Sequence, residues 1–269
     1  PVTQDVEKID PAYPPTNVEL SFRSGGATLP AYLMVANGRG PHPTVVLLHG
    51  FPGNEKNLDV AQALRRANFN VLFMHYRGAW GAEGRYSIAQ LPNDAIAALN
   101  FLRAEGSQYR VDALRLSLLG HSMGGFAALK AGAGDARVDC VIGLAAANLG
   151  EYASRPEEQK KGFAAYTDRL FMLNGFSGRQ ALDELRANAR QFDLRNIGQG
   201  LSGKSVLLMT GSADTVVPPA VQERIAEAYA GISRLDLTAV EMEGADHSFA
   251  ARRVALQRAI VSYMATRCR

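Results

Sequence analysis

One serine stands in a setting that could activate it for nucleophilic attack. Ser122 lies within the sequence GHSMGG, after the apolar run Leu116–Leu119 and before the alanine-rich stretch Met123–Ala131. So tight a strand-to-helix turn strains the serine backbone, and flanking glycines let strand and helix approach without Cβ clashes. Free N–H groups at the helix N-terminus would favour developing negative charge. Matches to G-x-S-x-G also arise by chance, but the strand and helix on the correct sides favour Ser122 as a nucleophile.

A serine hydroxyl needs a base to take its proton, and five histidines are available. His42 lies in a loop flanked by prolines, and His49 and His75 end expected strands. His121 adjoins the nucleophile, so its side chain should diverge from it. Only His247 lies downstream, in the loop between the last expected strand and the last expected helix. In the chain order serine, acid, histidine, His247 is the predicted base.

The acid that orients this base should follow a core strand between the nucleophile and the base. Asp214 does so, because it lies in the loop after the apolar run Val206–Thr210. Asp193 belongs to a region without strands, and Asp236 lies inside an expected strand. Asp246 adjoins the base itself, where a side-chain bond of the required geometry is awkward, and a turn-forming role suits it better. Position therefore favours Asp214.

A tetrahedral intermediate also needs at least two backbone N–H donors. The residue after the nucleophile, Met123, supplies one. The second should come from the loop that follows the apolar run Thr44–His49, which reads HGFPG. Pro52 has no N–H group, so Phe51 is the expected donor. The same residues also suit a turn, and a turn is what would aim the amide.

The elements that must position these residues alternate along the chain. Apolar strand-length runs and helical runs follow one another from residue 44 to the end, which predicts an α/β fold with a mostly parallel central sheet covered by helices on both faces. The first 17 residues are expected to form an arm, and residues 18–35 a β-hairpin, within one domain spanning 18–269. Residues of about 150–203 lack a convincing strand and predict a helical insertion in the position of a lid.

Four motifs together resemble a known superfamily. HGFPG, GHSMGG, GSADTVVP and GADHSF occur in this order with fold-like spacing, and the sequence resembles the α/β-hydrolase superfamily of serine hydrolases from about residue 18 onward. The YRGAWG segment and the N-terminal hairpin look most like its dienelactone-hydrolase and prolyl-oligopeptidase-like branch, which includes single-domain esterases. The resemblance implies Ser122, Asp214 and His247 as the triad, and Phe51 and Met123 as oxyanion donors. Dienelactone hydrolases typically carry cysteine where this chain has serine, which argues against that activity.

The substrate walls are expected to be aromatic and apolar. No acidic residue or arginine stands out in the sequence as a reader of charge, so an uncharged, mainly apolar substrate is expected. Ordinary core packing is an equal alternative for each aromatic residue. The candidate wall residues are Phe51, Tyr76, Trp80 and Met123, with Tyr166, Phe171 and Phe176 from the insertion.

Composition excludes several other classes. The net charge is +3 and the basic residues form doublets rather than a tract, so neither nucleic-acid nor membrane-surface binding is expected. No uncharged apolar run reaches the roughly 18 residues of a membrane span. The chain shows no phosphate-binding loop, no dinucleotide glycine pattern and no metal-ligand cluster, so no cofactor and no metal are expected. The oligomeric state is left open.

The start of the sequence and its two cysteines bear on the cellular compartment of the protein. The sequence starts at Pro1 without a leader, which fits a mature secreted or periplasmic protein slightly better than a cytoplasmic one. Pairing of Cys140 with Cys268 is conceivable but has no spacing argument. The expected partner is a small-molecule ester. A peptidase, amidase or thioesterase using the same triad is the alternative, followed by a binding protein that keeps the fold without turnover.

Overall fold

The structure of the protein is a computed structural model that describes residues 2–268. The strands are β1 (Thr16–Ser24), β2 (Ala27–Val35), β3 (His42–Leu48), β4 (Asn70–Met74), β5 (Val111–His121), β6 (Cys140–Leu144), β7 (Ser205–Gly211) and β8 (Asp236–Met242). The α-helices are α1 (Leu58–Arg66), α2 (Leu91–Glu105), α3 (Met123–Gly134), α4 (Glu157–Thr167), α5 (Gly178–Ala187), α6 (Ala189–Phe192), α7 (Pro219–Tyr229) and α8 (Arg253–Arg267). Short 3-10 helices are η1 (Ile88–Gln90), η2 (Gly106–Tyr109), η3 (Leu149–Ser154), η4 (Leu194–Leu201) and η5 (Ala250–Arg252).

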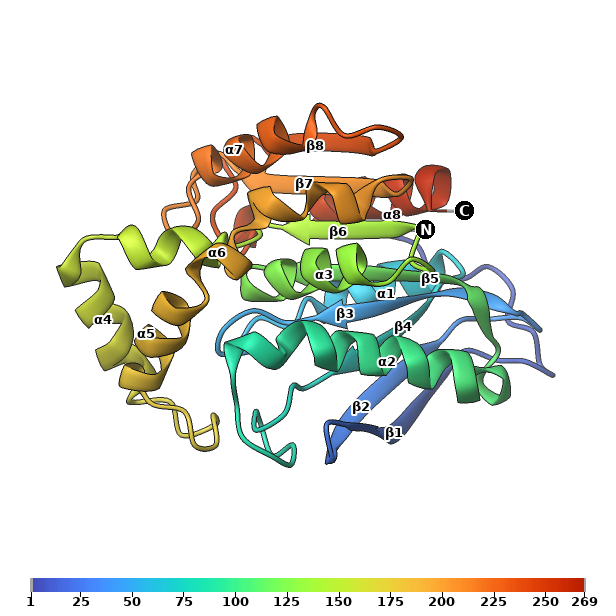
Figure 1. Cartoon of the computed structure of the whole chain (residues 1–269). Coiled ribbons are helices and arrows are strands. Elements are labelled where there is room, and N and C mark those ends of the chain that lie inside the picture. The colour runs from blue at the N-terminus through green and yellow to red at the C-terminus, as the bar shows by residue number, and fades with distance from the viewer. Residues whose placement is uncertain (1, 269) are drawn as a thin grey trace.

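The strands form one sheet of eight strands in the order β1-β2-β4-β3-β5-β6-β7-β8. Strands β4, β3, β5, β6, β7 and β8 run parallel, and β2 joins β4 antiparallel at one side. Helices cover both faces of this twisted sheet (Figure 1). The predicted α/β fold with a mostly parallel central sheet is therefore confirmed.

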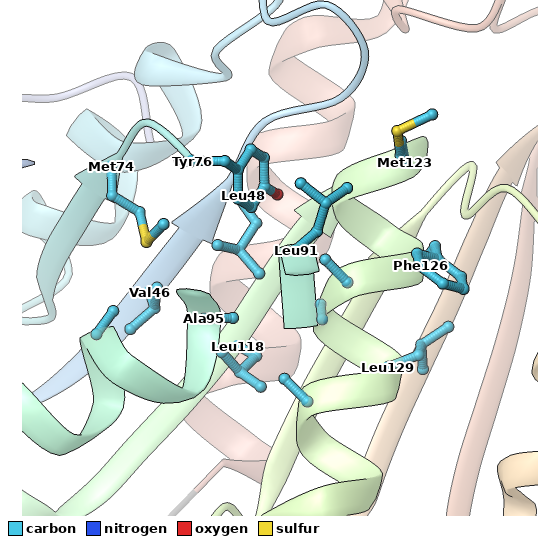
Figure 2. Close-up of a cluster of buried hydrophobic side chains, with 14 of the residues drawn as sticks. Val46, Leu48, Met74, Tyr76, Leu91, Ala95, Leu118, Met123, Phe126 and Leu129 are labelled. Atoms are coloured by element: carbon cyan, nitrogen blue, oxygen red, sulfur yellow. The ribbon is translucent and has the colours of Figure 1, made fainter. Parts of the chain in front are cut away.

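Two hydrophobic cores, one on each face, hold the helices to the sheet. Successive strand side chains point to opposite faces, so Val46 and Leu48 of β3 join the core beneath α2 and α3, whereas Val45 and Leu47 join the core beneath α1 and α8. Figure 2 shows part of the first of these cores, with Leu48 and Leu118 from the strands, Leu91 from α2 and Phe126 from α3. Strands buried on both faces explain the continuous apolar runs of the sequence.

The expected N-terminal hairpin is present. Strands β1 and β2 pair antiparallel through a two-residue turn, Gly25 and Gly26, whose φ angles are +53° and +84°. Glycine adopts this left-handed backbone at low cost, and such turns match the twist of paired strands. Residues 2–15 contain neither helix nor strand, and β1 begins at Thr16, slightly before the predicted end of the arm. Pro1 lies outside the described residues.

The region expected as a helical insertion divides into two parts. Helices α4 and α5 lie beyond the carboxyl ends of the parallel strands, at the left of Figure 1. By contrast, η4 packs against α3, and its Leu194 and Leu201 are fully buried in the main core. Only the first part can cover a site at that edge of the sheet, because the second part is already committed to the core.

The two cysteines form a disulfide. Cys140 opens β6 in the middle of the sheet, and Cys268 directly follows α8. The bond joins residues separated by 128 positions and fastens the last helix to the sheet. Among residues 2–268, no helix is both long and apolar enough to cross a membrane.

Candidate active site

Ser122 occupies a strained turn between β5 and α3. Its φ of +56° is unusual for a residue other than glycine, and three backbone hydrogen bonds maintain it. The Ser122 N–H donates to the carbonyl of Leu144 (2.8 Å), while the Ser122 carbonyl accepts from the N–H groups of Ala147 (3.0 Å) and Phe126 (3.1 Å). Strand β6 and the loop after it thus hold the turn from the side. Ser122 thus lies between the carboxyl end of β5 and the N-terminus of α3, as the sequence motif predicts.

The glycines of the motif are required by close contacts. A Cβ atom at Gly120 would lie 2.0 Å from the carbonyl oxygen of Gly124, and one at Gly124 would lie 2.2 Å from that of Leu48. Both contacts are with backbone, which cannot swing aside as a side chain can. Only glycine lets α3 begin this close to β3 and β5.

The predicted base and acid form a pair. The Nδ1 atom of His247 lies 2.8 Å from Oδ2 of Asp214, and the Asp214 side chain is fully buried. The other carboxylate oxygen, Oδ1, accepts from the N–H groups of Val216 (2.8 Å) and Val217 (2.9 Å). The loop after β7 therefore fixes the carboxylate independently of the histidine. An imidazole held this way keeps its proton on Nδ1, which leaves Nε2 free to accept one.

The rival carboxylate does something else. Asp246 Oδ1 accepts from the N–H of Ala250 (2.7 Å), and its backbone carbonyl accepts from the N–H of Phe249 (3.0 Å). These bonds close the turn that leads from the loop of the base into α8. Asp246 thus has the turn-forming role expected from the sequence.

Ser122 and His247 line the same cavity. Within residues 2–268, however, the Ser122 hydroxyl makes no hydrogen bond. In substrate-free enzymes the bond between nucleophile and base is often long and tightens when substrate binds. The cavity brings the two groups to one surface.

His121 links the loop that carries His247 to strand β5, a role that the sequence did not suggest. Its Nε2 lies 2.8 Å from the backbone carbonyl of His247, so this nitrogen carries the proton and donates. Burial, with His247 nearby, lowers the pKa of His121 to about 4. The ring therefore stays neutral near pH 7. The ring thus reaches the backbone of the loop that carries His247.

The loop after β3 lies against the nucleophile. A Cβ atom at Gly50 would be only 3.1 Å from Cβ of Ser122. His49 Nδ1 lies 2.7 Å from the carbonyl oxygen of Gly50, which belongs to the same planar peptide as the N–H of Phe51. Because the two groups of a trans peptide point in opposite directions, fixing this carbonyl also fixes the direction of the Phe51 N–H.

A second histidine, His75, forms a hydrogen bond with the free ring nitrogen of His49. Nδ1 of His75 lies 3.2 Å from Nε2 of His49, so His75 donates and His49 accepts at that nitrogen. Burial lowers the pKa of His49 to about 3 and that of His75 to about 4, with Lys56 adding to both shifts. Both rings are neutral near pH 7. The His75–His49–Gly50 chain is a feature that sequence patterns did not reveal, since both histidines looked like ordinary strand ends.

The other expected donor is available as well. Met123 is the first residue of α3, and the first N–H groups of a helix have no acceptor within the helix. In the described part of the chain, Phe51 N–H donates to no backbone carbonyl. Both amides are therefore open to an acceptor from outside the chain, which is the first requirement of an oxyanion donor.

The cavity has a volume of about 430 Å³, which suits a small organic molecule. Its walls come from the loops that carry Ser122 and His247 and from α4 and α5 of the insertion. The lining residues are Phe51, Ser122, Met123, Ala147, Asn148, Leu149, Tyr152, Arg155, Phe163, Tyr166, Leu185, Val216, Val217, Val221 and His247. Most are apolar, as expected.

Several expected walls lie elsewhere. Tyr76 is buried and donates to the carbonyl of His49 (3.1 Å), and Trp80 donates to that of Pro52 (2.7 Å). Both support the loop rather than the cavity. Phe171 is 91% exposed, and Phe176 packs against Tyr86. None of these four residues lines the cavity. The sequence pattern alone could not show which side of its segment each residue would face.

Other wall residues were missed by the sequence. Tyr152 and Phe163 line the cavity, and Phe163 contacts the ring of Phe51 with centroids 5.4 Å apart. Arg155 also lines it, so the expectation of a pocket without arginine is wrong. These residues stand in the charged stretch before and within α4, where no motif marks them. In the described part of the chain, no cluster of three or more His, Cys, Asp or Glu could hold a metal ion.

Comparison with known proteins yields structures of the same fold. The chain superposes on Est1E from Butyrivibrio proteoclasticus with a TM-score of 0.72 and 20% identity, covering 92% of this chain and 97% of that one. A puromycin hydrolase gives a TM-score of 0.70 at 22% identity, covering 96% of this chain and 40% of the other. At these identities the likeness concerns the fold.

Sequence comparison adds relatives and a family. An uncharacterised 31.7 kDa protein from the traX-finO intergenic region of Escherichia coli is 30% identical over 141 residues, which are 51% of this chain and 48% of the relative. The chain thus matches about half the length of that curated relative. The model of the α/β-hydrolase family matches residues 45–257, a span that contains the serine, the acid and the base. The chain belongs to the α/β-hydrolase family.

Proposed function

We propose that the protein is a serine hydrolase that cleaves carboxylic esters with an uncharged, mainly apolar acyl or alcohol group. The observation that carries the proposal is the buried Asp214–His247 pair (2.8 Å), with His247 and Ser122 on the wall of one apolar cavity. A nucleophile, a base and an acid in this order are what acyl transfer through a serine requires.

In the first half of the reaction, Ser122 attacks the ester carbonyl while Nε2 of His247 takes the hydroxyl proton. The carbonyl oxygen becomes an oxyanion, and the N–H groups of Phe51 and Met123 stabilise it. Asp214 stabilises the imidazolium that forms. His247 then gives its proton to the leaving alcohol, the bond between carbonyl carbon and alcohol oxygen breaks, and an acyl ester remains on Ser122.

In the second half, a water molecule takes the place of the alcohol. His247 accepts a proton from the water as it attacks the acyl carbonyl, and the same two amides stabilise the second oxyanion. Collapse of this intermediate returns the proton to the oxygen of Ser122 and releases the carboxylic acid. The same machinery can attack amides and thioesters, so a peptidase, amidase or thioesterase is the alternative.

The first prediction concerns the nucleophile. A fluorophosphonate reporter should attach covalently to the wild-type protein and not to Ser122→Ala, because only an activated serine displaces its leaving group. Ser233→Ala is the matched control, because it removes an exposed hydroxyl that does not line the cavity, and it should label fully. Intact-protein mass spectrometry reads the result. A folded wild-type protein that fails to label would favour a binding protein without turnover.

Substrate class is tested with the same preparation. Aryl esters with acyl chains of increasing length are compared with the matching anilides and thioesters. A higher kcat/KM on esters supports the proposal. Preference for anilides or thioesters would replace it by the alternative, with the triad unchanged.

We further propose that α4 and the segment before it act as a cover over the site. Phe163 and Tyr166 of α4 reach the cavity, and Phe163 packs on Phe51 beside the nucleophile. The Cys140–Cys268 disulfide supports placement in an oxidising compartment, in keeping with a secreted or periplasmic protein. The partner on this view is a small-molecule ester.

A further inference from the structure

Arg155 lies between the catalytic cavity and a second cavity beside it. It follows η3 and precedes α4, and its side chain is partly buried. The second cavity has a volume of about 680 Å³ and shares Arg155, Val216 and Val221 with the catalytic one. A molecule that extends from Ser122 toward the second cavity would therefore pass the guanidinium.

The second cavity is electropositive. Its lining holds three arginines, Arg155, Arg195 and Arg224, against one carboxylate, Glu151. That carboxylate is already engaged by Arg224 (2.7 Å) and Arg195 (3.6 Å), and Arg195 also pairs with Asp193 (2.6 Å). These ion pairs leave no carboxylate in the cluster for the third arginine, Arg155.

Arg155 itself has no ionic partner. Within residues 2–268 its side chain makes no ion pair and no hydrogen bond, and its contact is with the ring of Tyr152, 4.8 Å from guanidinium carbon to centroid. A guanidinium stays protonated at all ordinary pH values and presents a fork of N–H donors. Partial burial of this charge is unfavourable unless an acceptor satisfies it, and an aromatic face compensates only weakly.

We propose that Arg155 selects substrates that carry a carboxylate at the far end of an apolar chain. This inference rests on the proposed ester hydrolysis and specifies its substrate class. A carboxylate offers two oxygens that match the guanidinium fork, whereas the apolar wall between Ser122 and Arg155 accepts the intervening chain. The substrate is then a monoester of a dicarboxylic acid, or an apolar acid esterified to an alcohol that ends in a carboxylate. Both present the same group to Arg155.

The experiment compares esters that differ only in the terminal charge. On the acyl side, 4-nitrophenyl monoesters of glutarate, adipate and suberate are measured beside their methyl-capped forms. On the alcohol side, butanoate esters of 4-hydroxybenzoic acid are measured beside those of its methyl ester. In one of the two series, wild type should prefer the carboxylate by about tenfold in kcat/KM, the effect of one charge-assisted contact. Arg155→Gln should abolish that preference.

Controls separate selectivity from folding. Arg155→Gln should lose far more kcat/KM on the carboxylate esters than on the neutral esters, and it should keep its thermal unfolding temperature. Arg155→Lys should retain part of the preference, because a point charge replaces the fork. Arg179→Gln removes the same charge from an exposed position of α5 and should behave as wild type.

The outcomes distinguish this inference from the function beneath it. If neutral esters are cleaved but the charged and capped forms react equally in wild type and Arg155→Gln, the inference is overturned while ester hydrolysis stands. If Arg155→Gln lowers stability without altering the ratio, the arginine serves only to pack on Tyr152, and the inference fails again. No labelling of Ser122 and no turnover of any ester would overturn the proposed function itself.

Discussion

At the scale of single residues, the site depends on groups fixed before substrate binds. Asp214 receives two N–H groups from its own loop and presents its remaining oxygen to His247. His121 holds the backbone of the same histidine, and His49 turns the peptide of the expected oxyanion donor. Hydrogen-bond donors and acceptors that are already oriented need not reorganise during reaction, which is how such sites lower a barrier.

The assignment of the acid can be tested by comparing two aspartates. Asp214→Ala should lower kcat/KM on an aryl ester by about 10²–10⁴-fold, because the imidazole loses its orientation and its countercharge. Asp246→Ala, the matched control, should mainly lower the free energy of unfolding by about 1 kcal/mol, since Asp246 accepts one backbone bond. Steady-state kinetics and urea unfolding give both numbers. A larger kinetic loss in a folded Asp246→Ala protein would refute the assignment.

At the scale of elements, the close approach of α3 to two strands determines where Ser122 lies. Gly120 and Gly124 are the positions at which the backbones meet, and neither leaves space for a methyl group. The positive φ angle of Ser122 follows from this approach, because the chain must turn from β5 into α3 at this single residue. The strain is borne by bonds from β6 and the loop that follows it.

Two glycine substitutions should have opposite effects. Gly124→Ala places a methyl group against the carbonyl oxygens of Leu48 and His49, so it should destabilise the fold by about 2 kcal/mol or more and displace the oxyanion loop. Gly162→Ala in α4 meets nothing within 4 Å and should stabilise by about 0.5–1 kcal/mol, as alanine does in a helix interior. Thermal and urea unfolding measure both. Equal stability of the two variants would show that the close approach is not required.

At the scale of the whole molecule, the disulfide connects the centre of the sheet to the end of the chain. Cys140 and Cys268 are 128 positions apart in the sequence, and the segment between them contains the insertion, Asp214 and His247. Helix α8 also covers one face of the sheet through Leu256, Ile260 and Met264, all fully buried. The covalent bond and this apolar face together hold α8 against the sheet.

Removing the disulfide should therefore cost stability more than activity. The double variant Cys140→Ala with Cys268→Ala should lose about 2–4 kcal/mol of unfolding free energy, because its unfolded chain is no longer constrained. Ester turnover at 25 °C should remain, since neither cysteine lines the cavity. Reductant should lower the unfolding temperature of the wild type and leave the variant unchanged. A wild type insensitive to full reduction, confirmed by thiol titration, would contradict this prediction.

The sequence by itself determined the fold class and the three residues of the expected triad. Strands buried on both faces leave long apolar runs, and a nucleophile turn demands glycines on either side of the serine, so both features are local in the chain. Chain order then distinguishes Asp214 and His247 from their rivals. The hairpin and the alternation of strands and helices along the chain follow from the same patterns, with boundaries displaced by a few residues.

Only the tertiary structure decided what surrounds the site. The His75–His49–Gly50 chain, the tether from His121 and the position of Arg155 between two cavities all join residues from separate elements. Tyr76, Trp80 and Phe171 looked like substrate walls, yet two support a loop and one faces outward. Periodicity reports which side of an element is apolar, but packing between distant elements determines which apolar side meets a cavity, and that information is not local in the chain.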